Sequence, residues 1–326
     1  MNKPKVLVTR EVFAETLEYL NQHCLVTMNE TGVRYAPQDL TANLRGMQGA
    51  VLTVTEKVDA QILEACPGIK VLANAAVGYN NIDVPACTQR GIMVTNTPGV
   101  LTNSVADYAM GLLIATCRRI TEGEHHLRSG QWNDTFPKQM LGMDVHGATL
   151  GIFGFGRIGE AIAKRARGFD MKVIYHNRRR ASPESERAVN ATYVSKEDLL
   201  RQADVVMLIM PYNPETHHFI GTAQLALMKP TGVLINMARG GIVDDAALIR
   251  ALSARQIWAA GLDVYENEPK FLPEFLPLKN VVLSPHIASA SEPTRQAMAM
   301  TAAKNCVAAL CGETPPNLVN PEVKAK

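Results

Sequence analysis

The sequence predicts an α/β fold with two domains, each built on a parallel sheet covered by helices. The chain has 326 residues, which suggests two domains at roughly 150 residues per domain. Short β-branched or apolar runs alternate with helical patterns, as expected for parallel strands joined by crossovers. A glycine-rich turn at residues 154–159 also stands between such a strand and the helical pattern that follows it.

The first alternation ends near Pro98 and predicts one α/β domain. Its expected strands are Val6–Thr9, Leu25–Met28, Ala50–Thr55, Val71–Ala75 and Ile92–Thr95, with helices over Glu11–Gln22 and Asp59–Cys66. Ser104, followed by Asp107, has the pattern of a capping box. We therefore expect one long helix from there to about Thr121, in a position to bridge the two domains.

The second alternation predicts a doubly wound parallel sheet, because helical patterns separate most of its strands. The six expected strands are Thr149–Phe153, Lys172–Tyr175, Val205–Met210, Val233–Asn236, Ala259–Leu262 and Val281–Ser284. A helix is expected over Ile158–Phe169. A further helix is predicted over Glu292–Leu310, before a proline-rich tail.

Composition and charge exclude several classes of protein. Lys and Arg number 33 and Asp and Glu number 31, for a net charge of +2, so the chain has neither the charge of a nucleic-acid-binding protein nor an acidic tail. Hydrophobic residues make up 47%, which is ordinary for a globular protein and excludes a disordered or fibrous one. We therefore expect no nucleic-acid partner.

The apolar runs and the cysteines indicate a cytoplasmic protein. The run Val6–Val8 is too short for a signal peptide. The most apolar long stretch, Met110–Cys117, has about eight residues, whereas a bilayer-spanning helix needs roughly 20. The six cysteines form no Cys-x-x-Cys pair, so we expect reduced thiols and no zinc.

The turn Gly154-Phe155-Gly156-Arg157-Ile158-Gly159 has the spacing of a dinucleotide-binding fingerprint. One glycine permits the tight turn, one lets the backbone approach a pyrophosphate, and one packs the helix on the strand. The helix N-terminus then faces the anion. The alternative is a tight turn between strand and helix that binds no ligand.

The end of the next strand indicates which nicotinamide cofactor is preferred. NAD-binding proteins usually have an acidic residue about 20 positions after the fingerprint, where it binds the adenosine ribose. Here Asn177 is followed by Arg178, Arg179 and Arg180, which can donate paired hydrogen bonds to a 2′-phosphate. The sequence therefore predicts a preference for NADPH, with NADH possible. The alternative is that the arginines form a solvated basic turn.

Three successive strands end near polar residues that suit one reaction. Arg239, Glu268 and His286 follow the strands at 233–236, 259–262 and 281–284. Ligands of open α/β sheets bind beyond the carboxyl ends of the strands. An arginine can bind a carboxylate, a histidine can protonate a carbonyl oxygen, and a carboxylate can stabilise the imidazolium. Together they suit reduction of a 2-oxo acid by a hydride from the cofactor.

Each of these residues has a structural alternative when it is taken alone. Arg239 could pair with Asp244 or Asp245, Glu268 could be an exposed acid, and His286 could bond within a packed turn. The other histidines include the pairs His125–His126 and His217–His218. Neighbours on a helix point about 100° apart, so we interpret these pairs as surface or loop residues and expect no metal site.

Five segments together resemble the D-isomer-specific 2-hydroxyacid dehydrogenases, and within that family most closely the bacterial glyoxylate/hydroxypyruvate and 2-ketogluconate reductases. The resemblance covers almost the whole chain. The segments are Val77–Asp83, Gly151–Gly159, Asn236–Asp244, Gly261–Pro269 and Pro285–Ser291.

The resemblance implies a role for each matching site residue. Arg239 would bind the substrate, His286 would be the acid/base, and Glu268 would be its partner. Val77 and Gly78 would offer backbone donors to the substrate carboxylate. The expected cofactor contacts are Gly154, Gly156, Arg157, Ile158, Gly159, Asn177, Arg178, Arg179, Pro211, Ala238 and Asp263, with Arg157 and Ile158 on the pyrophosphate and Asp263 on the nicotinamide carboxamide.

The resemblance also implies two Rossmann-like domains. Residues 1–100, completed by 288–326, would form a smaller, discontinuous, flavodoxin-like substrate domain. Residues 101–287 would form the NAD(P)-binding domain, with the helices of a homodimer. Two residues depart from the family pattern. Ala288 replaces the usual Gly, which would tighten the pocket floor or shift the loop, and Asn177 replaces the common Asp.

We therefore expect an NADPH-preferring reductase that converts small 2-oxo acids to D-2-hydroxy acids. The resemblance suggests glyoxylate, hydroxypyruvate and 2-keto-D-gluconate as substrates. One alternative is a regulatory protein that senses the dinucleotide without turnover. Another is a dehydrogenase of the same fold that acts on formate, phosphite or a phosphorylated acid.

Overall fold

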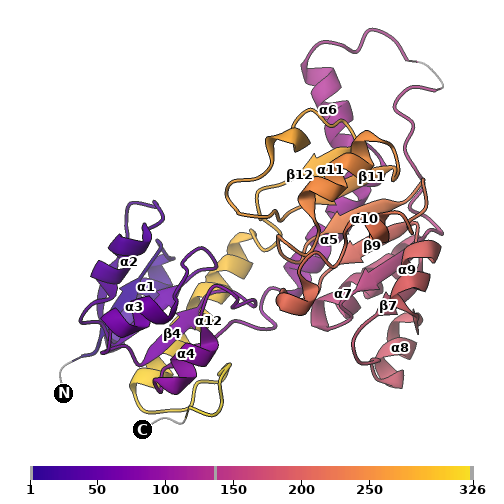
Figure 1. Cartoon of the computed structure of the whole chain (residues 1–326). Coiled ribbons are helices and arrows are strands. Elements are labelled where there is room, and N and C mark those ends of the chain that lie inside the picture. The colour runs from indigo at the N-terminus through magenta and orange to yellow at the C-terminus, as the bar shows by residue number, and fades with distance from the viewer. Residues whose placement is uncertain (1–2, 136–137, 324–326) are drawn as a thin grey trace. The chain divides into compact units, whose positions relative to one another are not determined.

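Two compact units make up the chain in the computed structural model, which describes residues 3–135 and 138–323 (Figure 1). Unit 1 comprises Met1–Leu101 together with Ala290–Lys326. Unit 2 comprises Thr102–Ser289. Each unit is built on its own parallel sheet. In the described residues, every helix is too short or too polar to cross a membrane.

Unit 1 contains a five-stranded sheet in the order β2-β1-β3-β4-β5, which is the order of the flavodoxin-like domain that the family resemblance implies. Its strands are β1 (Lys5–Val8), β2 (Leu25–Met28), β3 (Gly49–Leu52), β4 (Val71–Asn74) and β5 (Met93–Thr95). Its helices are α1 (Ala14–His23), α2 (Pro37–Leu44), α3 (Ala60–Ala65), α4 (Val84–Gln89) and α12 (Glu292–Leu310). Helices α2 and α4 were not predicted from the sequence; both are short and begin at or next to a proline.

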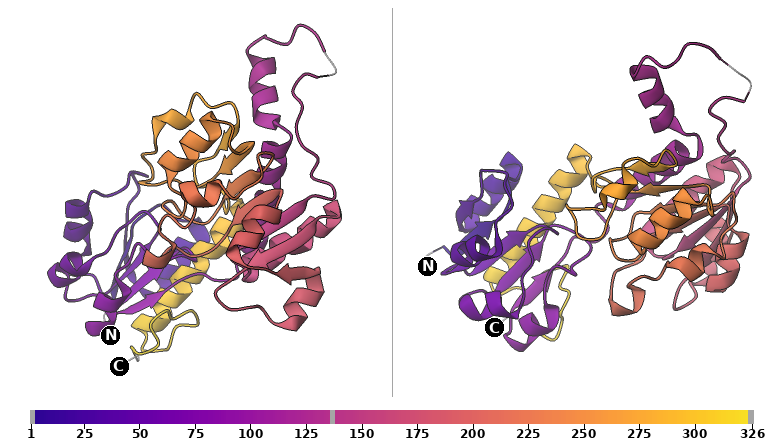
Figure 2. Two further views of the ribbon diagram at one scale, coloured as in Figure 1. Left: turned by 45° about the vertical axis from the view of Figure 1, so that its right-hand side comes forward. Right: turned by 45° about the horizontal axis from the view of Figure 1, so that its top comes forward.

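Helix α12 brings the end of the chain back to unit 1, and its bounds agree with those predicted. It packs on α1 and on β3, β4 and β5, and Figures 1 and 2 show it in yellow along this sheet. Its buried side chains Ala302, Cys306 and Val307 join Val6 and Val8 of β1 in one hydrophobic core. The five-stranded sheet therefore depends on residues from both ends of the chain.

Unit 2 contains a seven-stranded parallel sheet in the order β12-β11-β10-β9-β6-β7-β8. This is the doubly wound order with one added edge strand. Its strands are β6 (Thr149–Phe153), β7 (Lys172–His176), β8 (Ala191–Tyr193), β9 (Val205–Leu208), β10 (Val233–Asn236), β11 (Ala259–Leu262) and β12 (Val281–Leu283). The prediction of six strands missed β8, which has only three residues.

Helices cover both faces of this sheet. They are α5 (Thr102–Cys117), α6 (Ile120–Arg128), α7 (Arg157–Ala166), α8 (Pro183–Val189), α9 (Lys196–Gln202), α10 (Thr222–Leu225) and α11 (Asp245–Ser253), with 3-10 turns η1 (Arg167–Phe169), η2 (Pro214–Thr216) and η3 (Pro273–Phe275). The predicted capping box is wrong, because α5 begins two residues before Ser104. The predicted single helix is also wrong, because Arg119 adopts a left-handed conformation (φ 54°) between α5 and α6.

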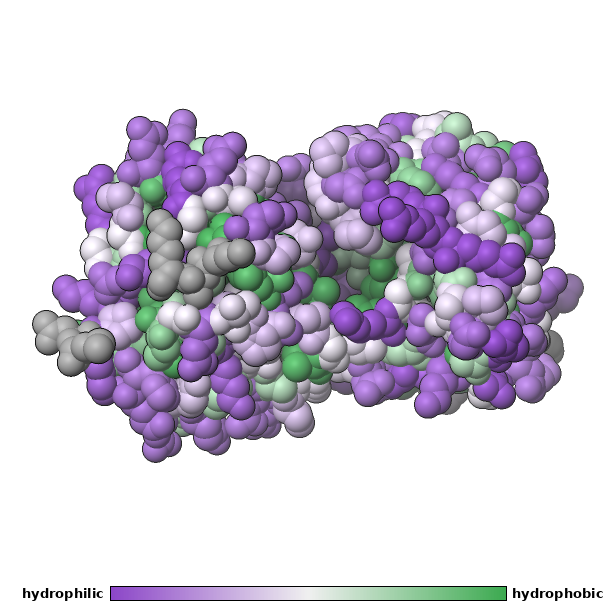
Figure 3. All heavy atoms as spheres, turned by 90° about the horizontal axis from the view of Figure 1, so that it is seen from below, coloured by the Kyte–Doolittle hydropathy of each residue, from purple (hydrophilic) through white to green (hydrophobic). Residues whose placement is uncertain are grey.

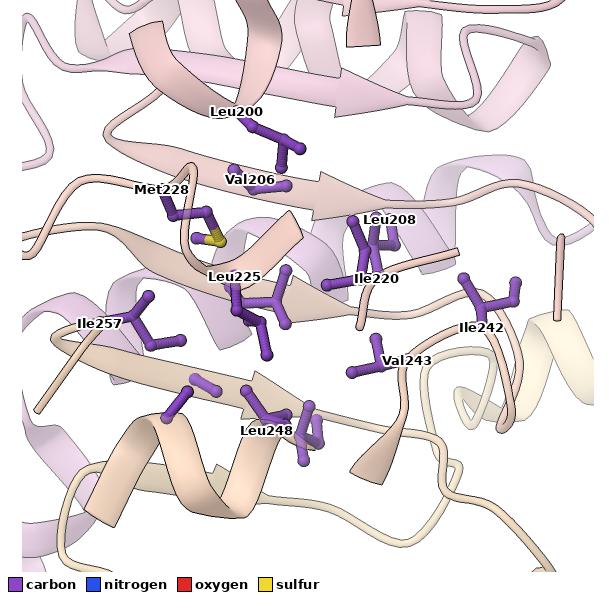
Figure 4. Packing of buried hydrophobic residues seen from close by; sticks show 14 of the residues in the cluster. Leu200, Val206, Leu208, Ile220, Leu225, Met228, Ile242, Val243, Leu248 and Ile257 are labelled. Carbon is purple, nitrogen blue, oxygen red and sulfur yellow. The ribbon is translucent and has the colours of Figure 1, made fainter. Parts of the chain in front are cut away.

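The core of unit 2 consists of aliphatic side chains from the central strands and the covering helices. All four residues of β9 and of β10 are buried. Figure 4 shows Val206 and Leu208 of β9 among side chains from α9, α10 and α11. The outer surface is mostly hydrophilic on the face seen in Figure 3. Burial on both faces explains why these strands are continuous apolar runs.

Candidate active site

The C-terminal ends of β10, β11 and β12 lie side by side, because these strands are adjacent and parallel. Arg239 follows β10, Glu268 follows β11 and His286 follows β12. The sheet therefore brings the three predicted residues to one edge of unit 2.

His286 and Glu268 form a hydrogen-bonded pair at this edge. The Nδ1 atom of His286 lies 2.7 Å from Oε2 of Glu268. The other carboxylate oxygen, Oε1, accepts a hydrogen bond from the Tyr265 amide at 2.9 Å. Burial opposes ionisation of Glu268, but the hydrogen bond and charge of His286, the Tyr265 amide and the charge of Arg239 outweigh it. The pKa of Glu268 is therefore below its usual value.

Arg239 is partly buried, and its Nη1 donates to the Ala238 carbonyl at 2.7 Å. Burial lowers the pKa of Arg239, and the negative charge of Glu268 partly opposes this decrease. The guanidinium stays charged because its intrinsic pKa is very high. Gly240 explains how this loop approaches the one that carries Glu268. A Cβ atom at Gly240 would lie 1.7 Å from the Tyr265 carbonyl oxygen, so no side chain fits there.

Asp263 anchors the segment that carries His286. Its Oδ1 accepts hydrogen bonds from the Ser284 hydroxyl at 2.7 Å and the Ile287 amide at 2.9 Å, and its Oδ2 accepts one from the Ala288 amide at 3.0 Å. His286 lies inside this anchored segment in a left-handed conformation (φ 54°). This anchoring role of Asp263 was not predicted from the sequence. Contact of Asp263 with a nicotinamide carboxamide stays a prediction.

Ala288 is buried and lies outside the left-handed region that would require glycine. Its side chain therefore causes no backbone strain at the position where the family usually has Gly.

The glycine-rich turn has the shape that a pyrophosphate needs. Gly154 has φ 101°, and a Cβ there would lie 2.8 Å from the Ile209 carbonyl oxygen. A Cβ on Gly159 would lie 2.3 Å from the Gly154 oxygen, so this glycine lets α7 pack on the turn. Gly156, the N-cap of α7, faces open space and makes no side-chain cap. The first amides of α7, including those of Arg157 and Ile158, therefore suit an anion.

Asn177 braces this turn from the end of β7. Its Oδ1 accepts the Phe155 amide at 2.7 Å, and its Nδ2 donates to the Phe155 carbonyl at 3.1 Å. The amide side chain thus satisfies a donor and an acceptor of the same residue, which a carboxylate cannot do. From the sequence, Asn177 was predicted as a replacement for an acidic residue and as a cofactor contact, and its bonds to Phe155 were not predicted.

The three arginines after Asn177 differ in their partners. Arg180 is held by Glu186 through two hydrogen bonds of 2.7 and 2.8 Å. Arg178 and Arg179 are exposed, and Nη1 of Arg178 lies 3.6 Å from Oε2 of Glu215, which belongs to η2 after β9. An acidic side chain therefore already faces one of the two arginines expected to bind a 2′-phosphate.

The remaining expected cofactor residues lie at ends of strands. Pro211 is exposed after β9, and its carbonyl accepts the Thr216 hydroxyl at 3.1 Å. Ala238 is buried after β10, and its amide donates to the Asn236 side chain at 3.2 Å.

Val77 and Gly78 belong to unit 1, in the loop after β4. Asn96 donates to the Val77 carbonyl at 2.9 Å, and Asn74 donates to the Gly78 carbonyl at 2.8 Å. Within residues 3–135 and 138–323, neither the Val77 amide nor the Gly78 amide donates a hydrogen bond. The two asparagines were not identified from the sequence. The Val77 carbonyl shares a peptide plane with the Gly78 amide, so Asn96 fixes the direction of that amide. The Ala76 carbonyl shares a plane with the Val77 amide and accepts the Thr97 amide at 2.9 Å.

A doubly wound sheet with a glycine turn at one strand end, and an arginine and a histidine–carboxylate pair at others, defines a nicotinamide-dependent dehydrogenase. Comparison of the chain with known protein families and structures identifies its family. The model of the "D-isomer specific 2-hydroxyacid dehydrogenase, NAD binding domain" matches residues 110–288. The chain belongs to the D-isomer-specific 2-hydroxyacid dehydrogenase family and is an NAD(P)-dependent dehydrogenase.

Similar proteins match along nearly the whole chain. The glyoxylate reductase of Thermococcus kodakarensis is 46% identical over 98% of this chain and 97% of its own. Among solved structures, an NADPH-dependent glyoxylate/hydroxypyruvate reductase from Sinorhizobium meliloti, in complex with NADP and malonate, is 36% identical with a TM-score of 0.88, covering 100% of this chain and 99% of that one. A 2-hydroxyacid dehydrogenase from Polaromonas is 37% identical with a TM-score of 0.90, covering 97% and 99%.

Proposed function

We propose that this chain is an NADPH-preferring reductase of small 2-oxo acids that yields D-2-hydroxy acids. Glyoxylate, hydroxypyruvate and 2-keto-D-gluconate are the proposed substrates. The observation that supports this most is the 2.7 Å pair of His286 and Glu268, at the sheet edge that also carries Arg239. The names of the relatives, which are glyoxylate and glyoxylate/hydroxypyruvate reductases, support the substrate class.

The roles of the three side chains follow from their chemistry. The bound nicotinamide supplies the hydride to the carbonyl carbon. Arg239 binds the substrate carboxylate through paired N–H donors. His286 gives its Nε2 proton to the carbonyl oxygen, because Nδ1 is held by Glu268. The charge of Glu268 stabilises the imidazolium before the transfer.

We assign the cofactor to the C-terminal edge of the seven-stranded sheet. The N-terminus of α7, with Gly154, Gly156 and Gly159, holds the pyrophosphate, and Arg178 and Arg179 hold the 2′-phosphate. Asn177, Pro211, Ala238 and Asp263 complete the expected contacts. In unit 1, the amides of Val77 and Gly78 donate to the substrate carboxylate. Unit 1 is accordingly the substrate domain and unit 2 the cofactor domain.

We further propose a homodimer that works in the cytoplasm. Helix α6 buries none of its side chains within the chain, and Ile120, Leu127, Trp132 and Leu141 in and after it are exposed hydrophobic residues. Such a surface suits a second copy. All six cysteines are free thiols, which agrees with a reducing compartment.

A steady-state panel tests the proposed function. The oxidation of NADPH and of NADH is followed with glyoxylate, hydroxypyruvate and 2-keto-D-gluconate, and the chirality of the product is determined. We expect turnover with at least one substrate, a higher kcat/KM with NADPH, and the D-isomer wherever the product is chiral. Tight NADPH binding without turnover of any 2-oxo acid would instead indicate a dinucleotide sensor.

A further inference from the structure

We propose that His217, His218 and Glu266 form a binding site for a divalent transition metal ion, with Zn²⁺ as the best match. One ligand atom of each residue lies within 4.8 Å of the other two. The two histidines follow η2, in the loop after β9, and Glu266 lies in the loop after β11. None of the three belongs to the proposed catalytic set. The expectation of no metal site rested on the lack of two histidines four residues apart on one helix, and it interpreted His217 and His218 as surface or loop residues. They are exposed residues of a loop, and the third group, Glu266, comes from a different loop.

The backbone holds the two histidines in place. His218 adopts a left-handed conformation (φ 49°), which is uncommon for a residue other than glycine. Its amide donates to the Gly241 carbonyl at 2.7 Å, and the Ile220 amide donates to the Ile242 carbonyl at 3.0 Å. These bonds attach the histidine segment to the loop after β10. The segment is therefore fixed before any ion binds.

His218 and Glu266 already lie at nearly the spacing of two metal ligands. The Nε2 atom of His218 is 2.9 Å from Oε1 of Glu266. Bond lengths of about 2.0–2.2 Å to a tetrahedral zinc ion separate neighbouring ligand atoms by roughly 3.3–3.6 Å. An ion between these two atoms would therefore move them apart by only a few tenths of an ångström.

His217 supplies the third ligand atom after a rotation of its ring. Its Nδ1 lies 3.2 Å from the Tyr212 hydroxyl, which leaves Nε2 for the ion and gives the imidazole the outer hydrogen bond that metal-binding histidines usually make. The rings of His217 and His218 are stacked at 3.9 Å with 23° between their planes. A lone pair lies in the plane of its ring, so binding must break this stack. Both residues are exposed, so the rotation displaces no core side chain.

The chemistry of the three groups favours zinc. Two imidazoles and one carboxylate suit Zn²⁺, Ni²⁺ or Cu²⁺ better than Mg²⁺ or Ca²⁺, and three protein ligands leave a position for water. Asp245 adds a second acidic group nearby, since its Oδ2 accepts the Glu266 amide at 3.0 Å. A bound ion would join the loop after β9 to the loop that carries Glu268.

The test is calorimetric titration of the reduced wild-type protein with Zn²⁺, together with the variants His218→Ala and Glu266→Gln. We expect one equivalent to bind to the wild type, and affinity at least about tenfold lower in each variant. Zn²⁺ should also raise the Tm of the wild type but not that of His218→Ala. Co²⁺ bound in place of Zn²⁺ should give visible absorption bands. A thiolate charge-transfer band should be absent, because no cysteine belongs to the proposed site.

Two control variants test whether Zn²⁺ binds at other groups of the chain. His125→Ala/His126→Ala removes the other adjacent histidine pair, and Cys311→Ser removes the exposed thiol. We expect both to bind Zn²⁺ like the wild type. The proposal is overturned if the wild type binds no Zn²⁺, if His218→Ala retains full affinity, or if either control loses the site. Because binding is measured without substrate, the outcome does not depend on the proposed reductase activity.

Discussion

The imidazole of His286 is oriented by Glu268, which is itself fixed from a second side. Oε2 of Glu268 lies 2.7 Å from the histidine Nδ1, while Oε1 accepts the Tyr265 amide at 2.9 Å. Because both oxygens are engaged, the carboxylate cannot turn away from the ring. Nε2 is thereby the ring nitrogen available for the proton transfer that we propose.

Removal of the imidazole should abolish proton transfer while the fold persists. We expect His286→Ala to lower kcat by about 10²–10⁴-fold, the usual contribution of a general acid. Glu268→Gln should lower kcat less, because the amide still bonds to the ring but cannot stabilise its charge. His146→Ala, which removes a histidine from the exposed pair with Asp170, is the control and should keep kcat. Near-normal turnover by His286→Ala would contradict the role assigned to this residue.

Replacement of Arg239 by lysine should mainly affect binding of the substrate carboxylate. A single ammonium cannot make the two parallel N–H contacts of a guanidinium. We expect Arg239→Lys to lower kcat/KM for the 2-oxo acid by at least about tenfold, with an unchanged Kd for NADPH by fluorescence titration. Arg250→Lys, at an exposed position on α11, should behave like the wild type. Equal kcat/KM in Arg239→Lys would remove Arg239 from the substrate site.

Cofactor preference should depend on the ion pair between Arg178 and Glu215. Their 3.6 Å contact must weaken for Arg178 to bind a 2′-phosphate. We expect Glu215→Gln to raise the ratio of kcat/KM for NADPH over NADH, by no more than about fivefold because the pair is exposed, and Arg178→Ala to lower it. Both effects should decrease as salt is added.

The matched control for this ion pair is Arg187→Ala, which removes an arginine from another exposed arginine–glutamate pair, with Glu184. It should leave the ratio unchanged. If Arg178→Ala also leaves it unchanged, the arginines are a solvated turn and the preference for NADPH has another origin.

Substitution of Asp263 should distinguish two roles of its carboxylate, which are to anchor the segment of His286 and to contact the nicotinamide carboxamide. If its carboxylate chiefly anchors the segment of His286, Asp263→Asn should lower kcat and the Tm while the Kd of NADPH stays constant. An asparagine can accept at one atom only, so the Ala288 amide would lose its partner. A raised Kd of NADPH with normal kcat would instead favour direct contact with the nicotinamide carboxamide.

The buried carboxyl of Asp245 should contribute to the pH dependence of the free energy of unfolding. Burial raises the pKa of this carboxyl from 3.8 to about 6. Between these values the folded chain binds more protons than the unfolded chain, so Asp245 makes the protein less stable as pH rises. We expect Asp245→Asn to gain stability relative to the wild type between about pH 4 and about pH 7.

Urea unfolding followed by tryptophan fluorescence measures this effect, because Trp132 and Trp258 both lie in unit 2. Asp144→Asn, at an exposed position of the same unit, is the control. A difference between Asp245→Asn and the wild type that does not vary with pH would contradict the prediction.

Local patterns predicted most of the fold. Periodicity alone located β2 at Leu25–Met28 and α12 at Glu292–Leu310 with the observed bounds. It did not locate β8, because three residues give too little alternation, or the break at Arg119, because nothing in an arginine indicates a left-handed backbone. The parallel, doubly wound character of the larger sheet followed from the helical crossovers, but the order of its strands was not predicted.

The site was predictable to the extent that it depends on strand ends. Arg239, Glu268 and His286 could be selected because the carboxyl ends of parallel strands meet. The contacts of Asn177 with Phe155 and of Asp263 with Ile287 could not, because each joins segments that are distant in the chain through specific side-chain directions. The cluster of His217 and His218 was missed for the same reason.

The return of α12 to unit 1 affects how the protein folds during synthesis. Residues 1–101 leave the ribosome with one face of the sheet lacking Ala302, Cys306 and Val307, which are added about 200 residues later. All of unit 2, Thr102–Ser289, is synthesised between these two parts of unit 1, so unit 1 can complete its core only after the whole sequence of unit 2 has been made. The nascent N-terminal segment therefore carries uncovered apolar surface until α12 is made, and such surface is open to aggregation or to a chaperone during that time.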